Sequence, residues 1–301
     1  MHSGYESFFG LFERPFSLTP DARYHFRSRA HARALGGLST GLARRAPVLL
    51  LTGDLGTGKS TLCRTLLRTF QQESRVVYIS NALLSPEELY RRLLQQLGAT
   101  RQEAAATDRL AGAGHDELSR WLAEWLRTSG GPRPLIFLDE AHLLPPVTVE
   151  GLLGLLSLES GEEPLLRVIL SSQPPTVGSP TLPRVLDDVV LHRARLTALE
   201  RDECEPYIQH RLHVAGGAPI TVGPKAVDVV HALSGGLPRL VNVLCERALQ
   251  EAAAIRVRRL EPSMFETAAA SLELLRLRSK RFRWYGTNRV GTGVAVPATY
   301  R

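Results

Sequence analysis

Several features that define large classes of proteins are missing from this sequence. No apolar run approaches the roughly 20 residues that a membrane-spanning helix needs. Residues 1–10 are polar and aromatic, so they lack the apolar core of a secretory signal. These absences argue against an integral membrane protein and against an exported one, and we expect the chain to be cytoplasmic.

Cysteine and lysine are scarce as well. Cys63, Cys204 and Cys245 lack the spacing of a metal site and lie in apolar helical patterns, so we expect buried free thiols. Nearly all of the positive charge is arginine, and the net charge is +7. A basic balance permits contact with nucleic acid, an anionic membrane or an acidic partner, but it selects none of them. The 301 residues, 44% hydrophobic, suffice for one large or two smaller cores.

One glycine-rich stretch carries the clearest chemical signal. Residues 53–60 read Gly-Asp-Leu-Gly-Thr-Gly-Lys-Ser and fit the pattern G-x-x-x-x-G-K-[ST]. An apolar run at 47–52 precedes them and an apolar helical pattern at 61–68 follows, so the loop joins a strand to a helix. Such a loop curls backbone N–H groups around an anion, and the helix N-terminus adds partial positive charge. The stretch predicts a binding site for the phosphates of a nucleoside triphosphate.

The loop residues have separate expected roles. Lys59 can reach the β- and γ-phosphates, and the Ser60 hydroxyl can bind magnesium. The residues expected to contact the nucleotide are Gly53, Asp54, Leu55, Gly56, Thr57, Gly58, Lys59, Ser60 and Thr61. We therefore expect ATP and Mg²⁺ as ligands.

Two carboxylates form the second chemical landmark. Asp139 and Glu140 directly follow an apolar strand pattern at 134–138, and α/β sheets bind ligands at the carboxyl ends of their strands. Asp139 is expected to hold the magnesium ion together with Ser60, and Glu140 to orient and polarise the attacking water. The sequence therefore predicts a nucleoside triphosphatase.

Gln173 is a further candidate for the site. It follows a buried strand pattern at 165–170, where a polar side chain would lie between the two carboxylates and the γ-phosphate. One interpretation is that Gln173 reads the state of the phosphate. The alternative is a polar residue at a strand end that bonds only to backbone.

The order of elements predicts an α/β fold followed by helices. Strand patterns alternate with helical ones as far as residue 196, which is typical of a parallel sheet. Ser85 and Glu88 predict a capping box at one helix start. Loops are expected at 98–114 and 174–183, and from residue 197 onward the pattern is helical only. Those helices are predicted at 202–214, 224–233, 238–254 and 261–275.

Arg239 is unusual for its position. It follows Pro238 at the start of a predicted helix, where the helix dipole disfavours a cation. One interpretation is that Arg239 binds an anion, and the alternative is that it pairs with a carboxylate of the helical region such as Glu246.

These residues together resemble the ExeA-type (general secretion pathway protein A) ATPases of the AAA+ superfamily, whose members serve type II secretion, pilus biogenesis and exopolysaccharide loci. The resemblance covers roughly residues 5–255. The stretches that carry it are 5–11 with 15–21, 53–60, 138–142, 168–174 and 236–242. It implies that Asp139 and Glu140 are the Walker B pair, that Gln173 holds the sensor-1 place and that Arg239 is the sensor-2 arginine. It also implies a homo-oligomer, a protein partner in a membrane-associated assembly system and a place beside the inner membrane.

The expected fold class is a P-loop NTPase of the AAA+ type, a parallel sheet sandwiched by helices and followed by a small all-α lid. We divide the chain into an N-terminal segment at 1–45 that packs on the ATPase core, a nucleotide-binding domain at 46–196, a lid at 197–278 and a basic, disordered tail at 279–301. Segments before such a loop often line the adenine pocket, but plain packing is the interpretation that we prefer for residues 1–45. The tail interleaves basic and aromatic residues, so it can bind nucleic acid or a membrane surface, or simply be solvated.

The chain departs from the family where an arginine finger is expected. Asp187 and Asp188 stand in places that usually hold arginines, and Arg184, Arg193 and Arg195 lie nearby without matching cleanly. Stimulation of hydrolysis between subunits is therefore an open point. Larger members also continue into a membrane span and a peptidoglycan-binding domain, and neither is found here.

Three other classes compete with this interpretation. Residues 139–142 spell the box of the DEAH helicases, but no second glutamine- and arginine-rich motif follows. A DNA-associated AAA+ ATPase of the transposition type, similar to TniB and TnsC, shares the core and suits the basic balance. A nucleotide-dependent switch with little turnover suits the missing finger motif, although Glu140 opposes it.

Overall fold

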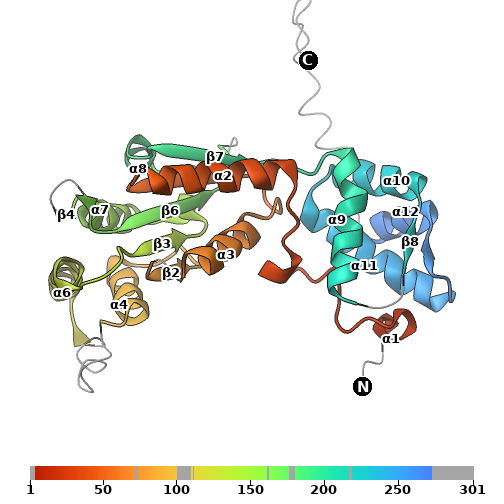
Figure 1. Ribbon diagram of the computed structural model, residues 1–301, viewed down its shortest axis with the longest axis horizontal. Helices are drawn as coiled ribbons and strands as arrows, with labels where there is room; N and C mark the ends of the chain where they lie inside the picture. The colour runs from red at the N-terminus through yellow and green to blue at the C-terminus, as the bar shows by residue number, and fades with distance from the viewer. Residues whose placement is uncertain are drawn as a thin grey trace, which may run out of the picture.

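The computed structural model describes residues 4–71, 74–99, 110, 112–160, 163–175, 180–216 and 219–272. Figure 1 shows two halves side by side, one built on a β-sheet and one built of helices. We call residues 29–196 the α/β half and residues 199–272 the helical half.

A five-stranded parallel sheet forms the centre of the α/β half, as predicted. Its strands are β1 (Val48–Gly53), β2 (Val76–Ile79), β3 (Leu135–Leu138), β6 (Arg167–Ser172) and β7 (His192–Leu196). Their order across the sheet is β2-β3-β6-β1-β7. Because β6 lies between β1 and β3, the residues after β6 lie between the glycine loop and the two carboxylates.

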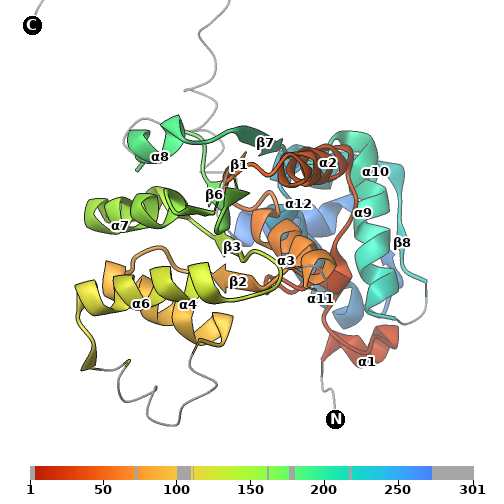
Figure 2. The same cartoon turned by 60° about the vertical axis from the view of Figure 1, so that its left-hand side comes forward.

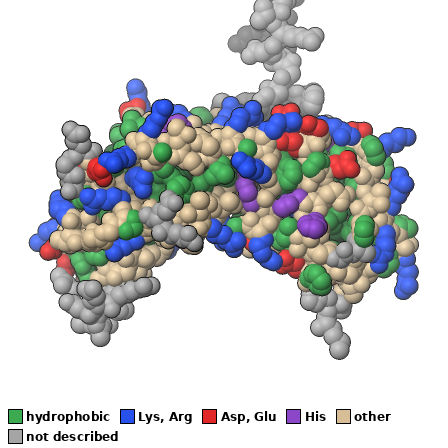
Figure 3. Space-filling view, in the orientation of Figure 1, with side chains coloured by type: hydrophobic (Ala, Val, Ile, Leu, Met, Phe, Trp, Pro, Cys, Tyr) green, Lys and Arg blue, Asp and Glu red, His purple; other side chains and the backbone are tan. Residues whose placement is uncertain are grey.

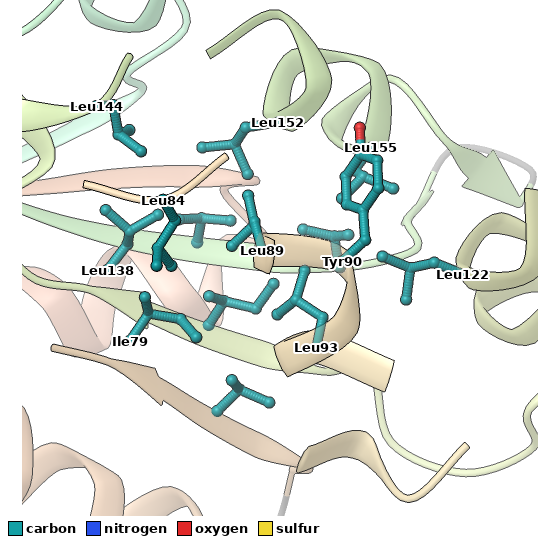
Figure 4. Close-up of a cluster of buried hydrophobic side chains, with 14 of the residues drawn as sticks. Ile79, Leu84, Leu89, Tyr90, Leu93, Leu122, Leu138, Leu144, Leu152 and Leu155 are labelled. Atoms are coloured by element: carbon teal, nitrogen blue, oxygen red, sulfur yellow. The ribbon is translucent and has the colours of Figure 1, made fainter. Parts of the chain in front are cut away.

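Helices cover both faces of this sheet (Figure 2). Leu49 and Leu51 face α2 (Arg29–Ala43) and α3 (Lys59–Phe70), because alternate strand residues point to opposite faces. Val48 and Leu50 belong to the cluster on the other face, which is covered by α4 (Pro86–Leu97), α6 (His115–Thr128) and α7 (Pro146–Leu156). Figure 4 shows this second cluster, where leucines from β3, α4, α6 and α7 lie together with Tyr90.

The predicted capping box at α4 is confirmed. The Ser85 hydroxyl accepts a hydrogen bond from the Glu88 N–H at 3.2 Å, and the Glu88 carboxylate accepts one from the Ser85 N–H at 3.1 Å. Pro86 occupies the first turn, where its missing N–H costs no helical bond. The helix therefore begins where the sequence placed it.

Shorter elements connect the main ones. A small antiparallel pair, β4 (Glu159–Ser160) with β5 (Glu163–Pro164), follows α7. A short helix, α8 (Arg184–Asp188), and a turn precede the last strand, so β7 begins at His192. Residues 100–109, 111 and 176–179, which belong to the two predicted loops, lie outside the described residues, as does the predicted tail.

The helical half contains the four predicted helices and two short strands that were not predicted. The helices are α9 (Arg201–Val214), α10 (Pro224–Ser234), α11 (Pro238–Ala254) and α12 (Pro262–Ser271). β8 (Thr221–Val222) pairs in parallel with β9 (Arg259–Leu260). The sequence pattern did not show these two strands, because strands of two residues are too short to show periodicity.

The N-terminal residues do not all pack where they were expected. Only α2 lies on the sheet of the α/β half, whereas α1 (Tyr5–Phe9), Phe16 and a single turn of 3-10 helix at Ala22–Tyr24 share a core cluster with α9, α10, α11 and α12. We call residues 5–26 the N-terminal strap. The aromatic side chains of the strap fill the apolar face of the helical half, and they are too widely spaced in sequence to reveal which half they join.

All three cysteines are buried free thiols, as predicted. Within the described residues, none of the helices combines the length and the apolar character needed to cross a bilayer.

Candidate nucleotide-binding site

The glycine loop joins β1 to α3 in a conformation that requires glycine. Gly56 and Gly58 have φ angles of +85° and +103°, in the left-handed region where a Cβ atom is strained. A Cβ atom at Gly58 would also lie 2.9 Å from Nε2 of His31. The loop therefore folds tightly in front of the first turn of α3, whose free N–H groups suit an anion.

Lys59 lies inside this loop. Its Nζ atom donates hydrogen bonds to the carbonyl oxygens of Gly53 at 2.8 Å and Asp54 at 3.2 Å. Burial lowers the pKa of Lys59, and the nearby carboxylates of Glu140 and Asp139 act in the opposite direction. Lys59 is only 6% exposed, and its ammonium group is bound by carbonyl oxygens of the loop. A bound phosphate would replace these contacts.

Asp139 is held by three hydroxyl groups. Its Oδ2 atom accepts hydrogen bonds from Ser60 at 2.7 Å and from Tyr78 at 2.8 Å, and its Oδ1 atom accepts one from Ser171. The two residues predicted to bind magnesium, Ser60 and Asp139, are thus in direct contact. One carboxylate oxygen beside a hydroxyl is a donor set that suits this hard cation. Tyr78 and Ser171 were not predicted, although their places near the carboxyl ends of β2 and β6 were a usable signal.

Glu140 has an unusual backbone and two side-chain neighbours. Its φ angle is +57°, which is uncommon for a residue other than glycine. Its Oε2 atom accepts a hydrogen bond from Nε2 of Gln173 at 3.3 Å and lies 3.3 Å from Nε2 of His142. The structure thus brings the Gln173 amide to the Glu140 carboxylate, so Gln173 does not bond to backbone alone. His142 was missed, and its buried Nδ1 atom has no hydrogen-bond partner among the described residues.

A pocket of about 220 Å³ opens in front of the loop. It is lined by Leu55 to Thr61 and Glu140, by residues 17–21 with His25 and Phe26 of the strap, and by parts of α9 and α11. The N-terminal segment therefore lines this pocket as well as packing on the helical half. Gly53, Asp54, Asp139 and Gln173 lie behind this lining, since they contact Lys59, Ser60 or Glu140 from within.

Arg239 brings the helical half to the loop. Its backbone N–H donates to the Gly56 carbonyl oxygen at 3.2 Å, and a Cβ atom at Gly56 would lie 2.7 Å from the Arg239 Cβ atom. Its guanidinium makes no ion pair with any described residue, while Glu246 accepts a hydrogen bond from Tyr5 at 2.6 Å. The suggested pairing of Arg239 with Glu246 is therefore not found.

Comparison with known proteins agrees with this geometry. A model of the AAA domain matches residues 43–177. General secretion pathway protein A of Aeromonas hydrophila is 36% identical over 248 residues, which cover 81% of this chain and 44% of that protein. The chain is an AAA-domain homologue of general secretion pathway protein A. It spans less than half of that relative's length.

Solved structures share the AAA+ fold with this homologue. Cdc6 of Pyrobaculum aerophilum matches with a TM-score of 0.68 at 17% identity, over 85% of this chain and 70% of that one. The ORC1 protein of Aeropyrum pernix, solved in complex with DNA, matches with a TM-score of 0.65 at 20% identity, over 92% and 74%. The RuvB Holliday junction branch migration motor of Thermotoga maritima matches with a TM-score of 0.55 at 17% identity, over 80% and 68%. At these identities the likeness shows the fold alone, an α/β sheet followed by helices.

Several residues around the AAA domain's pocket were missed by sequence reasoning. His31, at the start of α2, lies against Gly58, and burial lowers its pKa to about 4, so its ring is neutral near pH 7. Tyr207, Arg211 and Asn242 enter the pocket from α9 and α11. Sequence patterns assigned these three residues no role in the site, because their helices first had to be placed beside the loop.

One of the arginines near the last strand is already paired with a carboxylate. Arg193 donates from Nη1 to Oδ1 of Asp187 at 2.6 Å. Asp187 stands in a place where the family usually has an arginine. It binds Arg193, one of the arginines that lie near that place. The pair is exposed and joins α8 to the edge strand β7, outside the nucleotide pocket of this AAA domain.

Proposed function

We propose that this AAA-domain protein binds ATP with Mg²⁺ and hydrolyses it to ADP and phosphate. The observation that carries the proposal is the grouping of Lys59, the Ser60–Asp139 pair and Glu140 around one glycine loop. Lys59 and Ser60 begin α3, whereas Asp139 and Glu140 follow β3, so the fold brings together residues that lie 79 positions apart in the chain.

Each residue then has one role in the reaction. The loop N–H groups and Lys59 bind the phosphates, and Glu140 accepts a proton from a water molecule that attacks the γ-phosphorus atom. The bond between that atom and the β–γ bridging oxygen breaks, so ADP and phosphate leave. A magnesium ion held by Ser60 and Asp139 would neutralise charge on the phosphates.

Gln173 and Arg239 are proposed to report the nucleotide state. Gln173 holds the carboxylate of Glu140, so a γ-phosphate in front of it would change that contact. Arg239 belongs to the helical half and already touches the loop through its backbone, so its guanidinium can reach the phosphate when the halves close. Hydrolysis would release it.

We further propose that the cycle drives a conformational change in a secretion, pilus or exopolysaccharide assembly system, beside the inner membrane on its cytoplasmic side. The name of the Aeromonas hydrophila relative supports this, although the chain spans 44% of that protein. A protein partner of that system and a homo-oligomer that encloses the nucleotide are parts of the same proposal.

ATP turnover and nucleotide binding in two variants test the site. Lys59→Ala removes the charge that faces the phosphates and should abolish binding of a fluorescent ATP analogue, while Lys225→Ala on the surface of α10 should bind as the wild type does. Glu140→Gln should keep binding and lose at least about a hundredfold in kcat, the scale of lost base catalysis, whereas Glu150→Gln on α7 should not.

Two outcomes would contradict the proposal. Equal ATP binding by wild type and Lys59→Ala would remove the loop from the site. Equal and negligible turnover by wild type and Glu140→Gln, with tight ATP binding in both, would favour a nucleotide-dependent switch over an ATPase.

A further inference from the structure

A second cavity lies behind the strap, on the side away from the glycine loop. It is a groove of about 620 Å³ between strap residues 13–24 and the exposed side of α3, and we call it the arginine groove. The charged side chains that line it are Glu13, Arg14, Asp21, Arg23, Arg64, Arg68 and Arg211. Figure 3 shows Lys and Arg side chains near the concave junction of the two halves.

Both carboxylates in the groove are already paired with one arginine, Arg23. Arg23 donates to Glu13 at 3.0 Å and to Asp21 at 2.7 Å. Arg14 forms an ion pair at 2.9 Å with Glu6, outside the groove. Arg64, Arg68 and Arg211 form no ion pair with any described residue, so positive charge is in excess in this groove.

Arg211 is the most telling of the three, because it is only 7% exposed. Its Nε and Nη2 atoms donate to the carbonyl oxygens of Pro15 at 2.5 Å and Ser17 at 3.0 Å, and its guanidinium lies 4.5 Å from the centre of the Tyr24 ring. These contacts are all to uncharged groups, so they leave its charge without an anion. Burying a cation in this way is costly unless an opposite charge lies close to it.

The groove and the nucleotide pocket share one wall. Ser17, Thr19, Pro20, Asp21, Tyr24 and Arg211 line both. Arg64 connects them by a second route, since its guanidinium lies 5.4 Å from the ring centre of Tyr78, whose hydroxyl binds Asp139. A ligand in the groove would therefore lie against residues that also contact the nucleotide site.

We propose that the arginine groove binds a strand of nucleic acid by its phosphates. Arginine binds phosphate with paired N–H groups, and Arg64 and Arg68 project from the same side of α3 one helical turn apart. Three separate unpaired cations suit a repeated anion better than a single one. The Tyr24 ring is buried under Arg211, so it offers no surface on which a base can stack, and the binding is independent of base sequence.

The inference is independent of ATP hydrolysis, and the test keeps the two apart. Fluorescence anisotropy of a labelled 20-nucleotide single-stranded DNA is measured against the full chain with saturating ADP and Mg²⁺, so that the oligonucleotide cannot enter the glycine loop. The variant Arg64→Gln/Arg68→Gln removes two groove charges. The variant Arg120→Gln/Arg127→Gln removes the same charge from the exposed side of α6, at the other end of the sheet, and leaves the basic tail unchanged.

We expect the groove variant to bind the DNA at least about tenfold more weakly at 0.1 M salt, and the slope of log affinity against log salt to fall by about 1.4, since each lost phosphate contact in a single strand accounts for about 0.7. The α6 variant should bind as the wild type does. Thermal unfolding of both variants confirms that they are folded.

Three outcomes would overturn the inference. An equal loss of affinity in both variants would mean that net charge alone attracts the DNA. Undiminished binding by the groove variant would place the DNA elsewhere, for example on the tail. A labelled poly-glutamate peptide that competes with the DNA at equal affinity, and is also lost in the groove variant, would make the ligand an acidic protein segment.

Discussion

The two halves of the molecule are assembled in different ways. In the α/β half, core residues come from one continuous stretch of chain, from α2 to β7. In the helical half, Tyr5, Phe9 and Phe16 share a core with residues of α9 to α12 that lie far along the chain. The α/β half therefore contains a sequence motif for each of its chemical parts, whereas the helical half depends on contacts that no local pattern records.

The largest expected effect tests whether the strap belongs to the helical half. Phe9→Ala leaves a cavity in that core and should lower the free energy of unfolding by about 3–5 kcal/mol. Trp121 and Trp125 lie in α6, so tryptophan fluorescence in a Trp284→Phe background reports on the α/β half alone. In urea, the circular dichroism transition should shift while the fluorescence transition stays.

Phe137→Ala, in β3, is the matched control for this comparison. It removes an equally buried ring from the α/β half and should shift the fluorescence transition. If Phe9→Ala moved both transitions together, the halves would unfold as one cooperative unit and the contrast between them would be broken.

A pH titration sharpens the comparison at the junction of the halves. Burial, and next the charge of His25, lower the pKa of His31 to about 4, so the folded chain resists a proton that the unfolded chain takes up near pH 6.5. The stability from neutral His31 is complete above pH 6.5 and is lost as the pH falls toward 4, by about 2 kcal/mol at pH 5. His31→Asn retains a hydrogen-bond partner for Ser28. Between pH 7 and pH 5, urea unfolding of this variant should show a smaller loss in the free energy of unfolding than the wild type shows. An identical loss in both proteins would exclude His31 as its source.

Arg239→Ala tests whether the helical half senses the nucleotide. Losing a contact that ATP alone provides should weaken ATP binding about tenfold, or about 1.4 kcal/mol, and leave ADP binding nearly unchanged. Calorimetric titration of both nucleotides measures the ratio of the ATP affinity to the ADP affinity. Arg247→Ala, on the exposed side of the same helix, should leave the ratio unchanged, and the same result for Arg239→Ala would remove Arg239 from the mechanism.

The smallest expected effect lies within the α/β half. Ser85→Ala removes the side-chain cap of α4 and should cost about 1 kcal/mol, seen in the fluorescence transition. Glu88→Gln keeps an acceptor for the Ser85 N–H and should cost less. A cost as large for Glu88→Gln as for Ser85→Ala would mean that charge, and not the capping bonds, stabilises this helix start.

The sequence allowed much of the fold and the central chemistry to be predicted, for a physical reason. The glycine loop directly follows one strand in the sequence, and the two carboxylates directly follow another. A local pattern therefore identifies both. Tyr78 and Ser171 escaped because they reach Asp139 only once three strands are aligned. The strap and Arg211 escaped because their contact spans most of the chain, and β8 with β9 because each is only two residues long.

The position of the strap also has a consequence for how the chain is made. Phe16 leaves the ribosome about 190 residues before Cys204, its companion in the same core. At a synthesis rate of about 5–20 residues per second, the aromatic side chains of the strap wait about 10–40 s before their partners emerge. The α/β half can fold during that interval. The nascent strap then holds several aromatic rings in water, so it is the segment of this chain that we expect a ribosome-associated chaperone to bind.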